Sequence, residues 1–546
     1  MLTCSKILST LKLLPGPLAR HQRDGRPPVA TNRSCWLQRL PAWFGAALLA
    51  LGTFATASEA DTASKGYVYR GVQAPQVKSS PLFINLSQEL TRLQKELKGR
   101  SVSTTLAAAI ERSLLNNPEL AQSYAQIQQG QWNLVAVRRQ WFPSLAATAA
   151  GPGGGLWGYA GSRTTTSGTA LSGTVAERSF EDNLAWAPVL SLGWTFFDPS
   201  RGPEINAASE DLRSEQLLFN VTARNLVLQT QLSYFGLQEQ LQLVKSYEQI
   251  LAATSDQVKQ AEALFNTGNA SIADVEQIRT QQFQTLSLLI SGYLGVLDAA
   301  ASLAKSMALA PGQLALPGDS LDQYGQWDMT LQATIQQAQA LREEIRSSLA
   351  MASSAKWRAS ALFNRYWPRF SLVANGSYWN STSRSGSSAL SNPNSLQSSS
   401  WNGGLGLGFN WSIFDGGIAA AQAEANRALA RQFSDQAAVQ RLQVTEEVEK
   451  SYASYQTSRL ALLSSREQAD SARKAALAVR ERYNVGYADT TSVVQTLNQA
   501  INAANAYASS EREYNSAVAR LYRASAQWPE HAVSFLDQRV HGLKRR

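Results

Sequence analysis

The stretch Gly404-Leu405-Gly406-Leu407-Gly408-Phe409-Asn410-Trp411 alternates glycine or asparagine with large apolar residues. Successive side chains of a β-strand point to opposite faces, so the large residues share one face and the small ones share the other. Transmembrane β-strands of about ten residues have this pattern, with the apolar face toward lipid. The alternative is a half-buried strand of a soluble sandwich. An earlier stretch, 186–196, repeats the pattern with Trp186, Leu190, Leu192, Trp194 and Phe196 on one face.

Aromatic residues gather where both predicted strand pairs meet the neighbouring helices. The tryptophans among them are Trp141, Trp194, Trp367 and Trp411. Because tryptophan is enriched at membrane–water interfaces, this clustering favours membrane strands over a soluble sandwich. The segments joining the strands, 151–173 and 381–400, are rich in glycine, serine and threonine. We therefore expect both to be exposed loops on the outer side of the membrane.

Three short motifs occur twice in the chain and in the same order. The pairs are 141–143 with 366–368, 194–198 with 411–415, and 265–268 with 483–486. Ordered recurrence of this kind indicates an internal duplication. Each copy is predicted to run helix, strand, loop, strand, very long helix, glycine turn and returning helix.

The two long helices are predicted from the absence of proline in 204–266 and 418–484. An aspartate precedes each of them, and we expect Asp198 and, more weakly, Asp415 to cap the first turn. Apolar residues seven positions apart indicate coiled-coil packing in both copies. They are Leu237, Val244, Leu251, Val258 and Phe265 in the first copy, and Tyr455, Leu462, Ala469, Ala476 and Tyr483 in the second. The returning helices are expected at about 271–309 and 490–527.

The composition excludes several classes of protein. The chain has 546 residues, of which 17% are charged, and a formal net charge of +9. More than half of that excess lies in residues 1–60, so the remainder is too weakly basic for a nucleic-acid-binding surface. No run of 18 apolar residues occurs, which argues against a helical membrane protein.

Residues 1–60 have the order of a secretory signal peptide: a basic stretch, the apolar core 43–51, and small residues around 55–60. Removal of this leader would take away both cysteines, Cys4 and Cys35, and leave only His531 and His541 as histidines. A catalytic triad or a zinc site then has almost no residues from which to form. We expect no enzymatic activity, no metal and no cofactor.

The duplicated unit of strand pair, long helix, glycine turn and returning helix, behind a leader, resembles the TolC family of outer-membrane efflux proteins. The resemblance covers about 103–527, and its sharpest motifs are Phe265-Asn266-Thr267-Gly268 and Tyr483-Asn484-Val485-Gly486. It implies a homotrimer in the outer membrane. Four transmembrane strands per chain would form one twelve-stranded barrel, and a coiled-coil α-helical barrel would continue it through the periplasm. Four strands alone cannot close a membrane barrel, so strands must be pooled between chains on physical grounds too.

These patterns divide the chain into six parts. They are a signal peptide (1–60), an N-terminal segment of unknown role (61–102), the first repeat (103–310), a linker (311–330), the second repeat (331–527) and a tail (528–546).

The resemblance implies passive conduction. The chain would be the exit duct of a tripartite system, with an adaptor protein and an inner-membrane transporter as partners and outer-membrane lipid around the barrel. Small toxic compounds and secreted proteins both remain open as cargo, and a dedicated type I protein-secretion duct is the nearest alternative. A periplasmic or surface coiled-coil scaffold is the alternative from another class.

The resemblance also implies site residues. Adaptor docking falls on the hairpin tips, at Asn266, Gly268, Asn484 and Gly486. The periplasmic gate falls on Tyr483 and Asp274. The family's gate arginine matches Ala488 here, and its aspartates in the second copy match Ser492 and Gln495, so Arg482 is the candidate replacement for the arginine. The plainer interpretation of Tyr483 is that it is the last apolar residue of its heptad series.

Charge also follows the heptads of the second long helix. Arg466 and Arg480 occupy positions that match Glu248 and Glu262 of the first copy. One hypothesis is that these charges pair between helices and determine which helices become neighbours. The alternative is a solvated helix face.

Overall fold

The computed structural model describes residues 81–170, 173–320, 322–387, 394–529 and 532. The chain divides into two compact units, Met1–Gln73 and Ala74–Arg546, and all described residues belong to the second. The predicted signal peptide, residues 61–80 and most of the tail lie outside the described residues. The elements are α1 (Pro81–Arg100), β1 (Ser101–Thr104), α2 (Leu106–Asn116), α3 (Pro118–Arg139), β2 (Ser144–Ala149), η1 (Pro152–Gly154), β3 (Trp157–Ala170), β4 (Gly173–Trp186), β5 (Pro188–Phe197), α4 (Arg201–Asn266), α5 (Ile272–Ser306), β6 (Leu314–Pro317), α6 (Leu331–Leu341), α7 (Glu343–Phe363), η2 (Asn364–Tyr366), β7 (Arg369–Ser387), β8 (Asn394–Asn410), α8 (Ile418–Asn484) and α9 (Thr490–Ala524).

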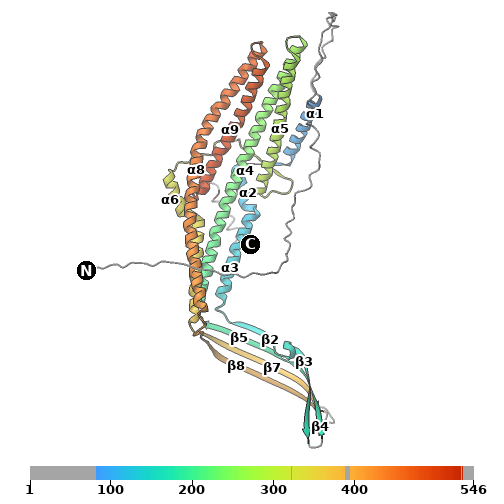
Figure 1. Ribbon diagram of the computed structural model, residues 1–546, viewed down its shortest axis with the longest axis vertical. Helices are drawn as coiled ribbons and strands as arrows, with labels where there is room; N and C mark the ends of the chain where they lie inside the picture. The colour runs from blue at the N-terminus through green and yellow to red at the C-terminus, as the bar shows by residue number, and fades with distance from the viewer. Residues whose placement is uncertain (1–80, 171–172, 321, 388–393, 530–531, 533–546) are drawn as a thin grey trace, which may run out of the picture. The chain divides into compact units, whose positions relative to one another are not determined.

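The larger sheet has six strands that amount to four long ones (Figure 1). β2 and β3 are successive parts of the first, and β4 and β5 are successive parts of the second. β7 pairs with β4 along its outer half and with β5 along its inner half, and its other side pairs with β8. All of these pairings are antiparallel. The prediction of four strands in a duplicated chain is confirmed.

The segments predicted as exposed loops are mostly strand. β3 and β4 pair over their whole length, from Trp157 opposite Trp186 to Ala170 opposite Gly173. β7 extends to Ser387, and β8 begins at Asn394. The loop prediction was wrong because it relied on low apolar content. Threonine and serine pair well in strands when both faces of the sheet are exposed, and the ladder of backbone hydrogen bonds needs no core.

Among the described residues, two edges of this sheet pair with no further strand. One is the outer edge of β2 and β3, and the other is the outer edge of β8. Open edges carry rows of unpaired backbone groups, which lipid cannot satisfy. The described strands of one chain therefore do not close a barrel.

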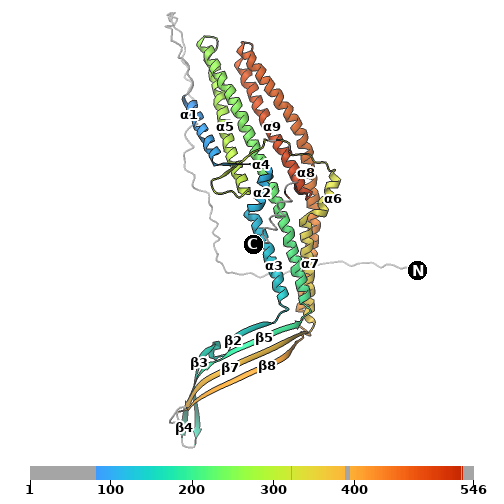
Figure 2. The same ribbon diagram turned by 180° about the vertical axis from the view of Figure 1, so that it is seen from behind.

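The two long helices match their predicted extents closely. α4 has 66 residues and α8 has 67, which corresponds to about 100 Å each at 1.5 Å per residue. α4 begins just after β5 and ends at the turn that contains Gly268, so strands and turn lie at opposite ends of it (Figure 1). α8 joins β8 to the turn at Gly486 in the same way. α5 and α9 return along α4 and α8, and α7 packs against both α4 and α8 (Figure 2).

The caps of the long helices reverse the expected ranking. Asp198 accepts a 3.0 Å hydrogen bond from the Ser200 N–H, ahead of the helix, and Ser200 itself is the N-cap. Asp415 accepts from the N–H of Gly417 at 2.9 Å and from that of Ala419 at 2.8 Å, inside the first turn of α8. Asp198 is followed by Pro199, whereas Asp415 is followed by Gly416. α4 begins at Arg201, two residues later than the proline at which Asp198 predicted its start. Asp415 is therefore the better cap.

Buried residues along α4 and α8 follow the predicted heptads. Leu237, Val244 and Val258 are buried in the first copy, and Tyr455, Leu462 and Tyr483 in the second. Among the described residues one helix, α5, is long and apolar enough to cross a membrane on length and composition alone. A third of its most apolar window is buried within the chain (33%), because α5 forms a hairpin with α4.

α1 gives residues 81–100 a place in the structure. Its Leu90 and Leu97 join the apolar cluster between α4 and α5, and the rings of Phe83 and Phe283 meet edge to face at 6.0 Å. β1 then pairs in parallel with β6, which lies in the predicted linker. These contacts fasten the segment to the hairpin of the first repeat.

Candidate functional site

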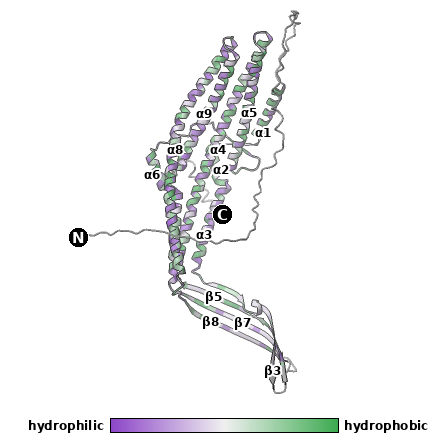
Figure 3. Cartoon of the chain, in the orientation of Figure 1, coloured by the Kyte–Doolittle hydropathy of each residue, from purple (hydrophilic) through white to green (hydrophobic). Residues whose placement is uncertain are grey.

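The sheet has one strongly apolar face and one face on which small or polar residues predominate. Leu405, Leu407 and Phe409 of β8 are 74%, 79% and 59% exposed. Register places Leu407 opposite Leu372 and puts Leu190 on the same side of the sheet. Figure 3 shows hydrophobic residues recurring along these strands. We call this side the apolar face; within the described chain no helix packs over it.

The four predicted interface tryptophans lie where the sheet meets the helices, and two of them make the same contact. Nε1 of Trp194 donates to the Trp141 carbonyl oxygen at 2.8 Å. Nε1 of Trp411 donates to the Tyr366 carbonyl oxygen, also at 2.8 Å. Trp367, next to Tyr366, is 59% exposed. The repeated contact ties the end of one strand to the start of its partner in each copy.

A second aromatic row crosses the apolar face farther from the helices, and the sequence analysis did not identify it. The ring of Tyr378 lies 5.4 Å from that of Trp186 and 4.9 Å from that of Trp401. Trp186 precedes Trp194 by eight residues, or roughly 27 Å along the chain at 3.4 Å per residue. Allowing for strand tilt, this spacing is comparable with the ~25 Å apolar band of outer-membrane barrels. The signal in the sequence was a second aromatic on the same period-two face.

The hairpin tips have matching backbone geometry. Gly268 and Gly486 have φ of 78° and 80°, the left-handed region that favours glycine. In each tip the N–H after the glycine donates at 2.8 Å to a carbonyl in the last turn of the long helix. Asn266 and Asn484, at the helix ends, are exposed. The second tip also carries Val485 and Tyr487, which are 66% and 77% exposed.

The candidate gate residues lie beside the tips, but the structure pairs them differently from the prediction. Oδ1 of Asp274 accepts a 2.9 Å hydrogen bond from the hydroxyl of Thr490, which begins α9. Tyr483 is buried in an apolar cluster that includes Val275 and Val493. Arg482 donates to the carbonyl of Tyr487 within its own tip at 3.3 Å. Asp274 and Tyr483 therefore belong to neighbouring but different kinds of contact.

Asp274 also forms a capping box with Ser271 at the start of α5. Its carboxylate accepts hydrogen bonds from the hydroxyl of Ser271 at 2.6 Å and from the N–H of the same residue at 3.0 Å. These bonds, together with the one from Thr490, hold the pKa of Asp274 below its usual range. The residue is therefore ionised at neutral pH, and the negative charge strengthens its bond to Thr490.

Two further polar contacts join the hairpins at positions farther from the tips than Asp274. The side-chain amides of Gln281 and Asn498 exchange hydrogen bonds of 3.0 and 3.3 Å. The hydroxyl of Tyr247 donates to Oδ1 of Asn505 at 2.9 Å. Sequence analysis missed this series, although Asp274 and Gln281 stand seven residues apart, as do Asn498 and Asn505. With the Asp274–Thr490 bond they form what we call the hairpin ladder.

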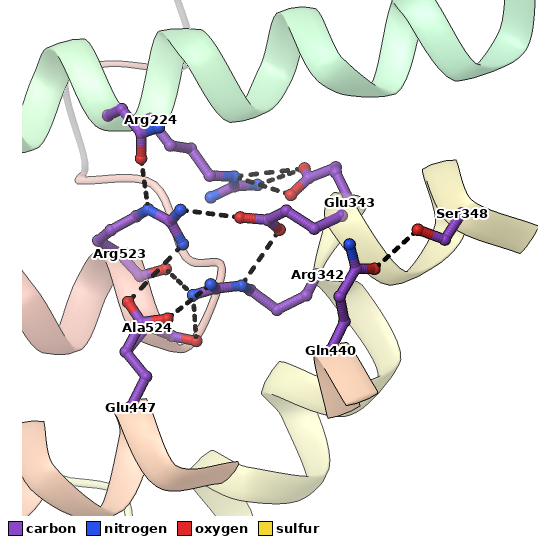
Figure 4. Close-up of polar contacts among 10 residues, drawn as sticks. Arg224, Arg342, Glu343, Ser348, Gln440, Glu447, Arg523 and Ala524 are labelled. Atoms are coloured by element: carbon purple, nitrogen blue, oxygen red, sulfur yellow. Dashed lines mark hydrogen bonds and ion pairs between the residues drawn. The ribbon is translucent and has the colours of Figure 1, made fainter. Parts of the chain in front are cut away.

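An ion cluster joins the repeats at the other end of α9 (Figure 4). Arg224 of α4 binds Glu343 at 2.9 Å, with both side chains 7% exposed. Arg342 contacts Glu344 at 3.2 Å and Glu447 of α8 at 2.7 Å, and its guanidinium also donates to the Arg523 and Ala524 carbonyls. Trp528 lies over the guanidinium of Arg224 at 4.1 Å.

Glu344 shows how strongly the cluster is coupled. Burial alone would raise the pKa of Glu344, but the guanidinium groups of Arg523 and Arg342 outweigh burial and hold that pKa below its usual range. The cluster therefore keeps Glu344 charged, and its contacts link α4, α7, α8 and α9.

The two glutamates proposed to pair with Arg466 and Arg480 have other partners in the chain. Glu262 binds Arg279 at 2.9 Å. Glu248 accepts from Gln94 at 2.8 Å and from the hydroxyl of Tyr293 at 2.5 Å. The pairing hypothesis was therefore wrong within one chain, because closer donors on α1 and α5 satisfy both carboxylates. Among the described residues no cluster of His, Cys, Asp and Glu is arranged to hold a metal ion.

Comparison with known proteins agrees with this architecture. The model of the outer membrane efflux protein family matches residues 109–309 and 321–527. No curated protein sequence gives a significant match.

Solved structures share the fold. The CmeC outer membrane channel of Campylobacter jejuni aligns with a TM-score of 0.59 at 15% identity, over 90% of this chain and 98% of its own. The outer-membrane channel OprN aligns with a TM-score of 0.58 at 17% identity, over 78% of this chain and 90% of its own. The outer membrane protein VceC of Vibrio cholerae gives 0.56 at 14% identity, over 77% and 96%. At these identities the likeness concerns the fold.

Proposed function

The chain belongs to the outer membrane efflux protein family, and we propose that it is the passive exit duct of a tripartite export system. The protein is located in the outer membrane and extends into the periplasm. The observation that carries the proposal is the combination of an exposed apolar sheet face with helices of about 100 Å on the same chain. The sheet can line a pore in lipid, and the helices can carry that pore across the periplasm.

We assign the duct to a homotrimer. The two open sheet edges support assembly, because β8 of one chain can pair with β2 and β3 of the next until the ring closes. Three chains would supply twelve long strands, a size that leaves a lumen. The faces of the sheet fit this arrangement, with leucines and tryptophans toward lipid and glycine, serine and asparagine toward the lumen.

The hairpin tips are the proposed docking sites for a periplasmic adaptor, which would connect the duct to an inner-membrane transporter. Asn266, Gly268, Asn484 and Gly486 are exposed at the two tips, and the glycine turns hold fixed loop shapes. The exposed Tyr487 gives the second tip an aromatic side chain that can be buried on docking.

The gate is proposed to lie in the hairpin ladder, with the Asp274–Thr490 bond nearest the tips. Opening the periplasmic end requires the hairpins of one chain to separate, and separation breaks this bond. Tyr483 packs in the neighbouring apolar cluster, and Arg482 bonds to the turn of its own tip.

Small toxic compounds and secreted proteins are both possible cargo, since a duct conducts what its transporter delivers. A coiled-coil scaffold is the competing function. Reconstitution of the full-length protein in planar bilayers separates the duct from the scaffold, because the duct must give stable single-channel currents and sediment as a trimer. A monomer without conductance would discard the proposal.

A further inference from the structure

The outer part of the sheet sorts its charges by face. In β3, β4, β7 and β8 beyond the second aromatic row, the described charged residues on the apolar side are Arg163, Arg178, Asp182 and Arg384. Those on the opposite side are Glu177 and Glu181. The excess is therefore basic on the side that faces lipid and acidic on the side that faces the lumen.

Contacts confirm that the basic residues share one surface. Nη1 of Arg163 binds Oδ1 of Asp182 at 2.7 Å, and the guanidinium of Arg163 lies 5.2 Å from the ring centre of Phe180. Arg384 stands directly opposite Asp182 in the β4–β7 ladder and is exposed. One aspartate cannot neutralise both Arg163 and Arg384, so these two arginines leave a positive charge on the surface.

Next to this surface, on the side nearer the helices, the apolar face contains a groove of about 790 Å³. Leu190 and Gly376 lie along it, and the aromatic row of Trp186, Tyr378 and Trp401 lines its outer end. Leu156, at the end of the glycine-rich break between β2 and β3, forms another part of its wall. The lining is almost wholly apolar.

We propose that the groove and the arginines together bind one phosphate-bearing lipid of the outer leaflet. An acyl chain would lie in the groove, the aromatic row would mark the level of the ester or amide linkages, and the phosphate would bind Arg163 and Arg384. Arginine suits this role because its planar guanidinium binds phosphate oxygens in pairs. The charge, the aromatic row and the groove follow each other in the order of headgroup, interface and chain.

This inference depends on the outer-membrane location of the sheet and not on what the duct conducts. If the wild-type protein gives a normal single-channel current but binds no lipid, the inference is overturned and the proposed function is not. Loss of both current and trimer would concern the proposed function.

The test uses the full-length trimer in a non-ionic detergent and native mass spectrometry. Bisphosphorylated lipid A is the probe, dephosphorylated lipid A is the comparison, and inorganic phosphate is the competitor. We expect lipid A to bind the wild type. The double variant Arg163→Gln, Arg384→Gln should bind lipid A about tenfold more weakly or worse, since each basic residue contributes to the attraction of anionic lipid. The matched control is Glu177→Gln with Glu181→Gln, on the other face of the same hairpin, which should bind as the wild type does.

Groove filling provides a second test that leaves the charges intact. A side chain at Gly376 would enter open space, as would one at Gly406 on the opposite face. Gly376→Leu should weaken lipid A binding, whereas Gly406→Leu should not. Equal binding by Gly376→Leu and the wild type, equal binding of dephosphorylated lipid A, or displacement by inorganic phosphate would each overturn the proposal.

Discussion

The hydroxyl of Thr490 donates a 2.9 Å hydrogen bond to Oδ1 of Asp274, and this bond joins the first turns of the two returning helices. Because those helices belong to different repeats, the bond connects the hairpins at their tips. Its position makes it the first contact that must break if the hairpins separate there.

Thr490→Val should therefore raise the resting conductance of the reconstituted channel. Valine keeps the shape of threonine but cannot donate the bond, and the loss of one charge-assisted hydrogen bond is worth about 1.5–3 kcal/mol. The matched control is Thr491→Val, because Thr491 is the exposed neighbour. Equal currents from both variants would remove the bond from the gate.

Tyr483→Phe should leave the resting conductance unchanged, because Tyr483 is 7% exposed in an apolar cluster and phenylalanine preserves that packing. Tyr483→Ala should instead lower the melting temperature, since removal of a buried aromatic ring costs about 3–5 kcal/mol. The two variants are compared by bilayer current and by thermal unfolding. A higher resting current in Tyr483→Phe than in the wild type would contradict this expectation and would mean that the Tyr483 hydroxyl helps to keep the gate closed.

Arg342→Met should destabilise the protein. The side chain of Arg342 is 5% exposed, and its loss removes contacts with Glu344 and Glu447 and the hydrogen bonds to two backbone carbonyls. Glu344 keeps its contact with Arg523, so we expect a cost of about 1.5–3 kcal/mol, as for the loss of a hydrogen bond to a charged group. Arg358→Met is the control, because the Arg358–Asp211 pair is exposed and such pairs contribute about 0–1 kcal/mol. Circular dichroism during heating measures both, and similar melting temperatures would contradict the expectation.

Glu511→Gln should stabilise the protein above pH 7 and have little effect below pH 4.5. Burial raises the pKa of Glu511 from 4.5 to about 7, and Asp322 adds to the rise, whereas the bond from Tyr507 and the charge of Arg466 oppose it. The folded state thus holds a proton that the unfolded state loses, so stability falls as pH rises between these values. At 1.36 kcal/mol per pKa unit the gain is at most about 3 kcal/mol. A pH-independent effect in thermal unfolding would contradict this origin.

Tyr487→Ser should weaken capture of the purified adaptor by the detergent-solubilised protein. Tyr487 is 77% exposed at the second tip, and burial of an aromatic side chain at an interface often contributes more than 1 kcal/mol. Asn269→Ser at the corresponding place of the first tip is the control and should have a smaller effect. Retention of full affinity by Tyr487→Ser would move the docking surface elsewhere.

Much of the fold was predictable from local pattern. The alternation in 404–411 identified β8, and the proline-free stretch 418–484 coincides with α8. β3 and the outer part of β7 were missed, because backbone pairing and not an apolar face holds them. The break between β2 and β3 was missed as well. There the N–H of Ala150 and the carbonyl of Leu156 both bond to Ala187, so a whole glycine-rich segment stands opposite one residue.

Contacts between the repeats were the least predictable part of the site. Gln281 and Asn498 are far apart in sequence, and only the packing of α5 against α9 brings them together. Glu262 shows the opposite error, since heptad matching suggested a partner on α8, whereas Arg279 is nearer along the same hairpin. Heptad position identifies the face of a helix but leaves the neighbour undetermined.

The open edges of the sheet have a genetic consequence. If the protein forms the proposed trimer, a chain whose strands are intact but whose tip is altered should still pair its β8 with a normal neighbour and enter a mixed ring. If one faulty tip is enough to block docking or opening, most mixed rings will be inactive. Expression of such a variant beside the normal gene should then reduce export more than a null allele does, whereas a variant unable to pair its strands should be recessive.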